Sequence, residues 1–396
     1  MKDNNSVVHV LVAPSEWNYD IHYRRRRLAE YLLKQSTTQK IVWIYPGNTL
    51  SHIITRELDN GIIEVAAPRF PWKLRHFGPF SRPLHSQLVR YISKHIAKYP
   101  TAKKVLWFTH LYFPGLVDIE AWNKVVYDCS DNWVAQWTNQ SYIEAVKSRI
   151  YLKILQIAED DIFKNSGCIF ATSEFLYKKA ASKTSSPVFL VENGVEFDKF
   201  YNALPGHNLK DVPRPRLGYL GAIDVRIDLA LLHKLAEQHR NWSIVLIGPM
   251  RPHQSIPEDL SFLIKDNNVR WVPGINPDEV PAYIKELDIG LMPYRDLEFN
   301  KGVFALKLFE YLACGLPVVG CGLPSTEKYN RDKIYIHTAS DPAQFAAACE
   351  RAISWAGDRE SEISRIELAK EADWQRKFDF MVGTALGNIR MDIRKY

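Results

Sequence analysis

The chain has 396 residues, of which 46% are hydrophobic and 24% are charged, so it is long enough for two domains and is not an intrinsically disordered protein. Its formal net charge is +6, and residues 20–104 hold 16 basic against 5 acidic side chains. This excess indicates either a surface that attracts anionic partners or a solvated basic face. The five cysteines are odd in number and form no C-x-x-C pair, which argues against a disulfide framework and a zinc knuckle.

The amino-terminal segment MKDNNSVVHVLVA lacks a signal-peptide cleavage region, and no stretch reaches the roughly 18 apolar residues that a membrane span requires. We therefore expect a cytoplasmic protein, with peripheral membrane contact still open.

In the first half, short apolar runs rich in β-branched residues alternate with longer helical patterns. This alternation predicts a parallel sheet that is covered by helices on both faces. The predicted strands are Val7–Ala13, Ile41–Tyr45, Val105–Phe108, Val125–Tyr127, Ile169–Ala171 and Val188–Val191, and a helix is predicted over His22–Lys34.

The stretch 202–215 is polar and contains Pro and Gly, which predicts a linker, and the alternation starts again after it. We expect two doubly wound Rossmann-like domains, 1–200 and 201–375, and a C-terminal helix in 376–396 that packs back on the first domain. Ligands of such sheets bind at the carboxyl ends of the strands. In the second domain the predicted strands are Arg216–Leu220, Ser243–Ile247, Val269–Val272, Ile289–Met292 and Val318–Val319, and the predicted helices are Ile227–His239 and Ala305–Cys314.

Gly221 lies where the first strand of the second half gives way to a helix. A glycine here lets the backbone approach a phosphate, and Arg226 adds a full charge nearby. The alternative is a glycine that only closes an ordinary strand-to-helix turn. Neither half carries G-x-G-x-x-G or a P-loop, and the chain has no H-E-x-x-H, so neither a dinucleotide cofactor nor a protein-built metal site is expected.

Lys307 and Glu310 are three residues apart, so a helix places both on one face. We expect a flexible loop at Gly302 to lead into this helix, and Gly315 and Pro317 to end it. The backbone after Gly302 and the Lys307 amine are suited to a diphosphate, and Glu310 to the hydroxyls of a ribose. A surface Lys–Glu pair is the alternative.

The run LKLFEYLACGLPVV resembles the donor-site helix of GT-B retaining glycosyltransferases, in particular glycosyltransferase family 4. Neighbouring motifs agree in order over about residues 190–375. These are VENGV with Phe200, the strand and loop at Arg216–Ala222, VLIGP at Val245–Pro249, the loop Val272–Gly274 and DIGLMP at Asp288–Pro293.

The resemblance implies a role for each matching position. Lys307 and Arg226 would hold the diphosphate of a nucleotide-sugar donor, and Glu310 would bind its ribose. The backbone at Gly221, Phe304 and Ala305 would assist, and the stretch Pro273, Gly274 and Ile275 would meet the base. His110, which follows the strand Val105–Phe108, resembles the family's histidine near the donor sugar, with a purely structural histidine as the alternative.

Gly302 departs from the family pattern, which often has a glutamate eight residues before the position of Glu310. That glutamate usually contacts the donor sugar. Some bacterial surface-polysaccharide members share the pattern with lysine at position 307. The segments APSEWNYDIHYRRRRLAEYL and VYDCSDNW resemble members of teichuronic acid biosynthesis.

The loop after the first strand is predicted to bind the acceptor through Trp17, Asn18 and Asp20, because an aromatic ring stacks on a sugar face. In the alternative, Trp17 only packs the loop. Aromatic and basic residues in 70–82, with Lys73 and Arg75, predict docking on anionic lipid, with a hydrophobic mini-core as the alternative. Arg24–Arg27 are expected to be surface residues, without a nucleic-acid role.

These observations predict a transferase that moves a sugar from a nucleotide diphosphate donor to a glycan or lipid-linked glycan. The resemblance implies that the donor is a UDP-sugar and that the configuration is retained. No metal or cofactor is expected. Two other interpretations stay open. One is a GT-B sugar-nucleotide epimerase, whose acid and base groups we do not identify. The other is a non-catalytic nucleotide-sugar-binding subunit, which Gly302 favours.

Overall fold

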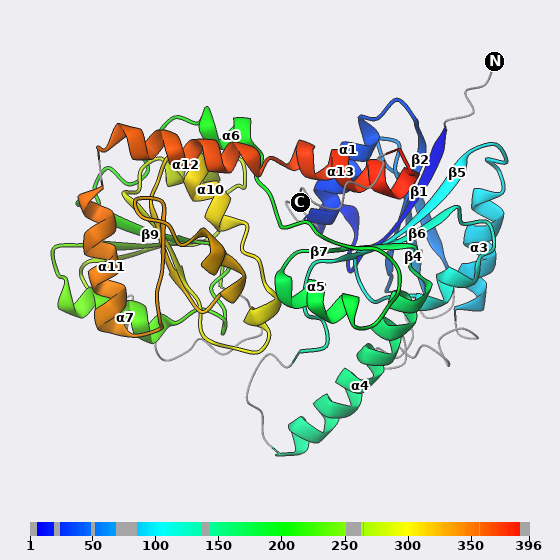
Figure 1. Ribbon diagram of the computed structural model, residues 1–396, viewed down its shortest axis with the longest axis horizontal. Coiled ribbons are helices and arrows are strands. Elements are labelled where there is room, and N and C mark those ends of the chain that lie inside the picture. The colour runs from blue at the N-terminus through cyan, green and yellow to red at the C-terminus, as the bar shows by residue number, and fades with distance from the viewer. Residues whose placement is uncertain are drawn as a thin grey trace. The chain divides into compact units, whose positions relative to one another are not determined.

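The computed structural model describes residues 6–19, 24–48, 52–68, 85–135, 142–250, 263, 265–355 and 357–388, without the side chains of residues 142–148. The chain forms two compact units (Figure 1). Unit 1 is Met1–Glu192 together with Phe378–Tyr396, and unit 2 is Asn193–Lys377.

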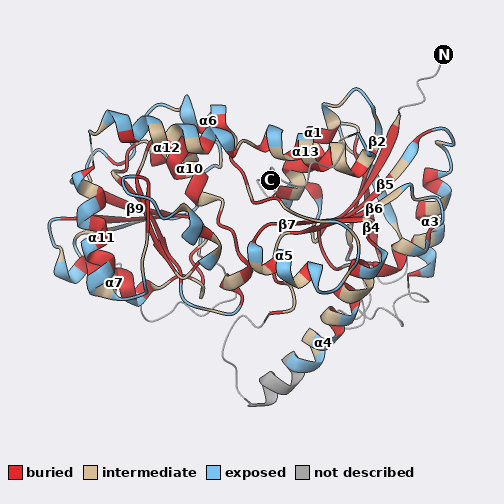
Figure 2. Cartoon of the chain, in the orientation of Figure 1, coloured by how far each residue is buried: buried red, intermediate tan, exposed pale blue. Residues whose placement is uncertain are grey.

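Unit 1 is built on an eight-stranded sheet in the order β3-β4-β2-β1-β5-β6-β7-β8. The β3–β4 pair is antiparallel and the other pairs are parallel. β1 is buried along its whole length, as expected for a central strand covered on both faces (Figure 2). The strands are β1 (Val7–Val12), β2 (Thr38–Pro46), β3 (Ile54–Glu57), β4 (Ile63–Ala67), β5 (Lys103–Phe108), β6 (Lys124–Cys129), β7 (Cys168–Ala171) and β8 (Val188–Leu190).

Every strand predicted for the first half is confirmed, whereas β3 and β4 were not predicted. The helices of unit 1 are α1 (Arg24–Leu33), α3 (Ser86–Ile96), α4 (Tyr142–Asn165) and α5 (Glu174–Ala181), with 3-10 turns η1 (Trp17–Tyr19) and η2 (Pro114–Asp118).

The C-terminal helix α13 runs over Trp374–Leu386, and its residues from Phe378 belong to unit 1. The ring of Phe378 packs against Tyr31 of α1 at a centroid distance of 5.6 Å, and the Tyr31 hydroxyl donates a hydrogen bond to Asp379. The ring of Phe380 lies across Phe189, at 5.5 Å. Aromatic contacts therefore hold the second half of α13 in the first unit.

The expectation that Arg24–Arg27 lie on the surface is wrong for two of the four residues. Arg24 and Arg27 are only 5% and 8% exposed. Arg24 forms an ion pair at 2.9 Å with Asp128 of β6, which is also buried. The first arginine of the run is therefore part of the core of unit 1.

Unit 2 is built on a six-stranded parallel sheet in the order β11-β10-β9-β12-β13-β14. The first strand of the unit, β9, thus lies between β10 and β12, and the order of strands reverses there. The strands are β9 (Arg216–Leu220), β10 (Ser243–Ile247), β11 (Val269–Val272), β12 (Ile289–Pro293), β13 (Val318–Cys321) and β14 (Tyr335–His337).

Both helices predicted for the second half are present, as α7 (Leu229–Gln238) and α10 (Lys307–Ala313). The predicted linker, 202–215, is part of unit 2. Leu209 is buried, and the N–H groups of Asn208 and Leu209 donate to the Glu286 carboxylate at 2.8 and 2.9 Å. The described helices are α6 (Phe197–Tyr201), α7 (Leu229–Gln238), α9 (Val280–Ile284), α10 (Lys307–Ala313), α11 (Pro342–Ser354) and α12 (Arg359–Glu371), with 3-10 turns η3 (Asn300–Gly302) and η4 (Pro324–Tyr329).

Gly290 of β12 is required by the packing of α10 on the sheet. The Tyr311 hydroxyl accepts a hydrogen bond from Leu220 N at 2.8 Å, which fixes a fully buried ring. A Cβ on Gly290 would lie 2.4 Å from that ring. We expect Gly290→Ala to lower the free energy of unfolding by about 1–3 kcal/mol or more, because neither the ring nor the strand can move freely.

Urea unfolding followed by circular dichroism measures this loss. Gly274→Ala is the control, because the nearest atom to its new Cβ would be 3.8 Å away. If Gly290→Ala and Gly274→Ala unfold at the same midpoint urea concentration, the Tyr311 ring can move aside.

Candidate functional site

The strand reversal in unit 2 brings together two loops that are far apart in the sequence. Asp228 N donates to Pro293 O and Arg295 N donates to Arg226 O, both at 2.8 Å, and Ile227 forms a bridge with Tyr294. The segments after β9 and β12 therefore fix each other at the carboxyl edge of the sheet. This is the position at which open α/β sheets bind their ligands.

The Lys307 side chain of α10 extends over the turn after β9. A Cβ on Gly221 would lie 2.6 Å from Lys307 Cε and 2.7 Å from Nζ, and Gly221 has a φ of +131°. Only glycine fits this combination of backbone angle and close approach. Sequence reasoning named both residues, and the structure brings them together.

Two tyrosines that sequence reasoning missed surround the Lys307 amine. Lys307 Nζ donates to the Tyr294 hydroxyl at 3.2 Å, and it lies 5.3 Å from the ring centre of Tyr219 and 5.8 Å from that of Tyr294. Both tyrosines are buried. The only signal for them in the sequence was their position along the chain. Tyr219 lies one residue before the end of β9, and Tyr294 directly follows β12.

Arg226 lies at the same edge and is paired with Asp224, which was also missed. The guanidinium donates to both carboxylate oxygens of Asp224 at 2.7–3.1 Å. Burial alone would lower the pKa of Arg226, but the hydrogen bond and charge of Asp224 raise it above its ordinary value. Arg226 is therefore a fixed cation whose charge is largely balanced inside the protein.

The segment before α10 is held in place by side chains, so the expectation of a flexible loop at Gly302 is wrong. Gly302, Phe304 and Ala305 are all buried. Asn193 donates to Phe304 O at 2.8 Å, and Asn300 donates to Arg295 O at 2.8 Å. Glu310 follows one turn later on α10 and is partly exposed, on the same helix as Lys307.

The stretch predicted to meet the base, Pro273–Ile275, follows β11 at the same sheet edge. Pro273 and Gly274 are exposed. The Trp271 indole donates to Gly248 O at 3.0 Å, which ties β11 to the turn after β10. In turn, Gly221 N donates to Ile247 O at 2.8 Å. The loops after β11, β10 and β9 are thus linked along one edge.

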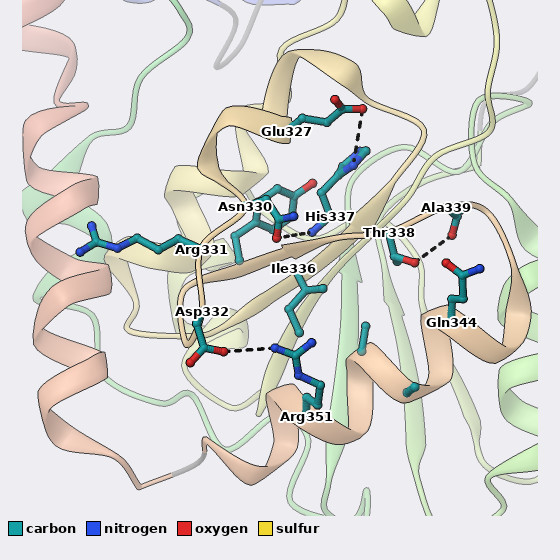
Figure 3. Close-up of a pocket in the computed structure, with 13 residues that line it drawn as sticks. Glu327, Asn330, Arg331, Asp332, Ile336, His337, Thr338, Ala339, Gln344 and Arg351 are labelled. Carbon is teal, nitrogen blue, oxygen red and sulfur yellow. Dashed lines mark hydrogen bonds and ion pairs between the residues drawn. The ribbon is translucent and has the colours of Figure 1, made fainter.

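A separate hollow of about 680 Å³ lies at the β14 edge of the same sheet (Figure 3). Two pairs of its side chains lie within ion-pair distance: Arg351 and Asp332 at 3.1 Å, and His337 and Glu327 at 3.7 Å. Burial lowers the pKa of His337. We place the candidate site at the β9–β12 edge, because the glycine turn and the cations lie there.

In unit 1, the loops after β1 and β5 also lie next to each other, since these strands pair. His110 follows β5, is 9% exposed, and its ring lies 4.0 Å from that of Tyr112 and 4.4 Å from that of Trp133. The predicted catalytic histidine is therefore held between two aromatic rings.

Trp17 packs the loop after β1, which was the alternative to sugar stacking. It is 5% exposed, its ring meets Trp43 edge-on at 5.2 Å, and the Arg26 guanidinium covers it at 4.4 Å. The prediction that Trp17 stacks on a sugar is therefore wrong. Asn18 is exposed in the same turn, and Asp20 lies outside the described residues.

Two further expectations concern membranes and metals. The segment 70–82 lies outside the described residues. No helix in the described part of the chain has the length and apolar character needed to cross a bilayer. The residues that the structure covers contain no group of three or more His, Cys, Asp or Glu side chains placed to hold a metal ion.

Comparisons with known proteins agree on one class of enzyme. Residues 214–354 match the family model described as glycosyl transferases group 1. The chain is 32% identical over 392 residues to a Bacillus subtilis (strain 168) protein named as the teichuronic acid biosynthesis glycosyltransferase TuaH, covering 96% of this chain and 97% of that protein.

Solved structures share the fold at low sequence identity. A sucrose-phosphate synthase from Thermosynechococcus elongatus superposes with a TM-score of 0.70 at 15% identity, over 95% of this chain and 98% of its own. A UDP-forming trehalose-phosphate synthase from Burkholderia xenovorans gives 0.65 at 13% identity, over 97% of this chain and 99% of its own.

Proposed function

This chain belongs to the glycosyl transferases of group 1 and has the GT-B fold, and we propose that it transfers a sugar with retained configuration from a UDP-sugar to a precursor of teichuronic acid. The motifs around Lys307 and Glu310 support membership of glycosyltransferase family 4. The acceptor class is supported by the 32% identity to TuaH. The UDP-forming synthase with the same fold supports UDP as the carrier.

The observation that carries the proposal is the Lys307 amine over the Gly221 turn. This cation, with Arg226 at the same edge, suits a diphosphate whose negative charge grows as it leaves. In the proposed reaction the bond between the sugar's anomeric carbon and the diphosphate oxygen breaks. The acceptor oxygen bonds to that carbon from the same face, and its proton passes to the departing phosphate oxygen.

Unit 1 is proposed to present the acceptor. Asn18 is exposed in the loop after β1, and His110 follows the neighbouring strand β5. The enzyme would meet a lipid-linked acceptor at the cytoplasmic leaflet of the membrane. The aromatic and basic composition of residues 70–82 supports this location.

A thermal-shift screen with UDP, GDP and their sugars tests the donor, because a ligand that binds the folded state raises the apparent melting temperature. UDP and UDP-sugars should give the largest shifts. Transfer is then followed with labelled UDP-sugar and membrane-derived acceptor. A GDP preference would overturn the proposed base, and an epimerised sugar nucleotide as the product would overturn the proposed reaction.

Glu310 is proposed to accept hydrogen bonds from the ribose hydroxyls. Glu310→Ala should weaken UDP binding roughly 10- to 100-fold, because hydrogen bonds to a charged group contribute about 1.5–3 kcal/mol. Calorimetry with UDP and 2′-deoxy-UDP isolates the contact: the wild type should prefer UDP, and the variant should lose that preference. Glu371→Ala, at an exposed glutamate of α12, is the control. An unchanged preference in Glu310→Ala would place the ribose elsewhere.

A further inference from the structure

The Lys307 amine is held by groups that do not neutralise it. Within the described residues its polar and ring contacts are the Tyr294 hydroxyl and the faces of Tyr219 and Tyr294. None of these contacts is with a carboxylate. Arg226, by contrast, is paired with Asp224. Lys307 is therefore a cation at this edge whose charge no described carboxylate balances, so it is available to a ligand.

The two tyrosines are themselves fixed. Both residues are buried, and the Tyr219 hydroxyl donates to Ala222 O at 2.9 Å. The backbone of Tyr294 is held where Tyr294 N donates to Met292 O at 3.0 Å. Burial, and then the proximity of Tyr294, raise the pKa of Tyr219 well above its ordinary value. This ring therefore stays neutral at any physiological pH. Fixed neutral rings stabilise an ammonium group without competing for it as a carboxylate would.

A lysine has four rotatable side-chain bonds and three N–H donors, so holding it in one position has a cost in conformational entropy. One donor is used by Tyr294, which leaves two for phosphate oxygens. A lysine already held above the Gly221 turn loses less entropy when the ligand arrives.

We propose that Tyr294 is a positioning residue, whose hydroxyl holds the Lys307 amine over the Gly221 turn in readiness for the diphosphate of the donor. This inference rests on the proposed function, since it takes a nucleoside diphosphate as the ligand of Lys307. Tyr219 supports the same amine through its ring. The sequence motif alone shows neither contact, because Tyr294 lies 13 residues from Lys307 along the chain.

The test uses the full chain and UDP as the probe. Tyr294→Phe keeps the ring and removes only the hydroxyl, so the fold should be retained. We expect UDP to bind about 3- to 10-fold more weakly, the range for loss of one neutral hydrogen bond. In a Lys307→Ala background the same change should have no further effect, because the hydroxyl acts through the amine. Tyr201→Phe, at an exposed tyrosine of α6, is the control.

Calorimetric titrations of the four proteins in this cycle separate the outcomes. If Lys307→Ala weakens UDP binding and Tyr294→Phe does not, the positioning role is wrong and the proposed donor site stands. If Tyr294→Phe weakens binding equally with and without Lys307, the tyrosine acts independently and the inference fails. If the wild type binds no UDP, the proposed donor fails and the inference fails with it.

Discussion

Lys307→Ala should lower sugar transfer about 100- to 1000-fold while leaving the protein folded. Loss of one group that stabilises developing charge in a transition state has an effect of this size. The structure gives a reason for expecting little compensation. Arg226 donates to both oxygens of Asp224, so its charge is largely satisfied within the protein, whereas Lys307 has no carboxylate within ion-pair distance in the described part of the chain.

The measurement is the initial rate of transfer at saturating donor, with the melting temperature as a check on folding. Lys307→Arg should recover only part of the rate, because a guanidinium does not occupy the compact space above Gly221. Lys234→Ala, at an exposed lysine of α7 in the same unit, is the matched control. A Lys307→Ala enzyme with near-wild-type turnover would remove the amine from the mechanism.

The parallel core of both sheets could be predicted because its strands are continuous apolar runs. β3 and β4, and the three-residue β14 of the second sheet, were not predicted. All four residues of β3 are exposed, and β4 contains Glu64, which breaks the apolar pattern. Glu64 is nevertheless buried, because it accepts hydrogen bonds from Trp17 N at 2.6 Å and from the Arg56 guanidinium. A charge that is satisfied by distant partners cannot be recognised from local patterning.

The candidate site shows the same limit. Gly221, Arg226, Lys307 and Glu310 were predicted from their residue types and spacing together with the family resemblance. Tyr219, Tyr294 and Asp224 were not, because a buried tyrosine after a strand is ordinary core composition until the structure shows which amine it meets. Trp17 shows the reverse error: an aromatic residue in a surface loop suggests ligand stacking, yet Trp43 and Arg26 cover its ring.

Arg24 and Asp128 form a buried pair on which the stability of unit 1 should depend strongly. Arg24 Nε lies 2.9 and 3.0 Å from the two carboxylate oxygens of Asp128, and the side chains are 5% and 1% exposed. The same guanidinium donates to Val191 O at 2.9 Å and to Glu192 O at 3.1 Å, where the chain leaves unit 1. One side chain thus joins α1, β6 and the segment after β8.

Asp128→Ala should lower the free energy of unfolding by about 3–5 kcal/mol, because it leaves Arg24 as a buried charge without its partner. Asp128→Asn keeps the shape and one acceptor, so its loss should be smaller. Asp332→Ala is the matched control, since the Asp332–Arg351 pair has side chains 68% and 62% exposed and should contribute less than about 1 kcal/mol.

Because the chain has two units, thermal unfolding need not be two-state, and the unit that each variant affects can be identified. UDP should stabilise unit 2, where the proposed donor site lies. Asp128→Ala should then lower the midpoint temperature of the other unfolding transition, the one that UDP does not shift. If Asp128→Ala lowers the midpoint temperatures of both transitions, the Arg24–Asp128 pair stabilises the second unit as well as the first. If Asp128→Ala has no larger effect than Asp332→Ala, the buried pair is not what holds α1 to β6, and the carbonyls of Val191 and Glu192 become the contacts to test.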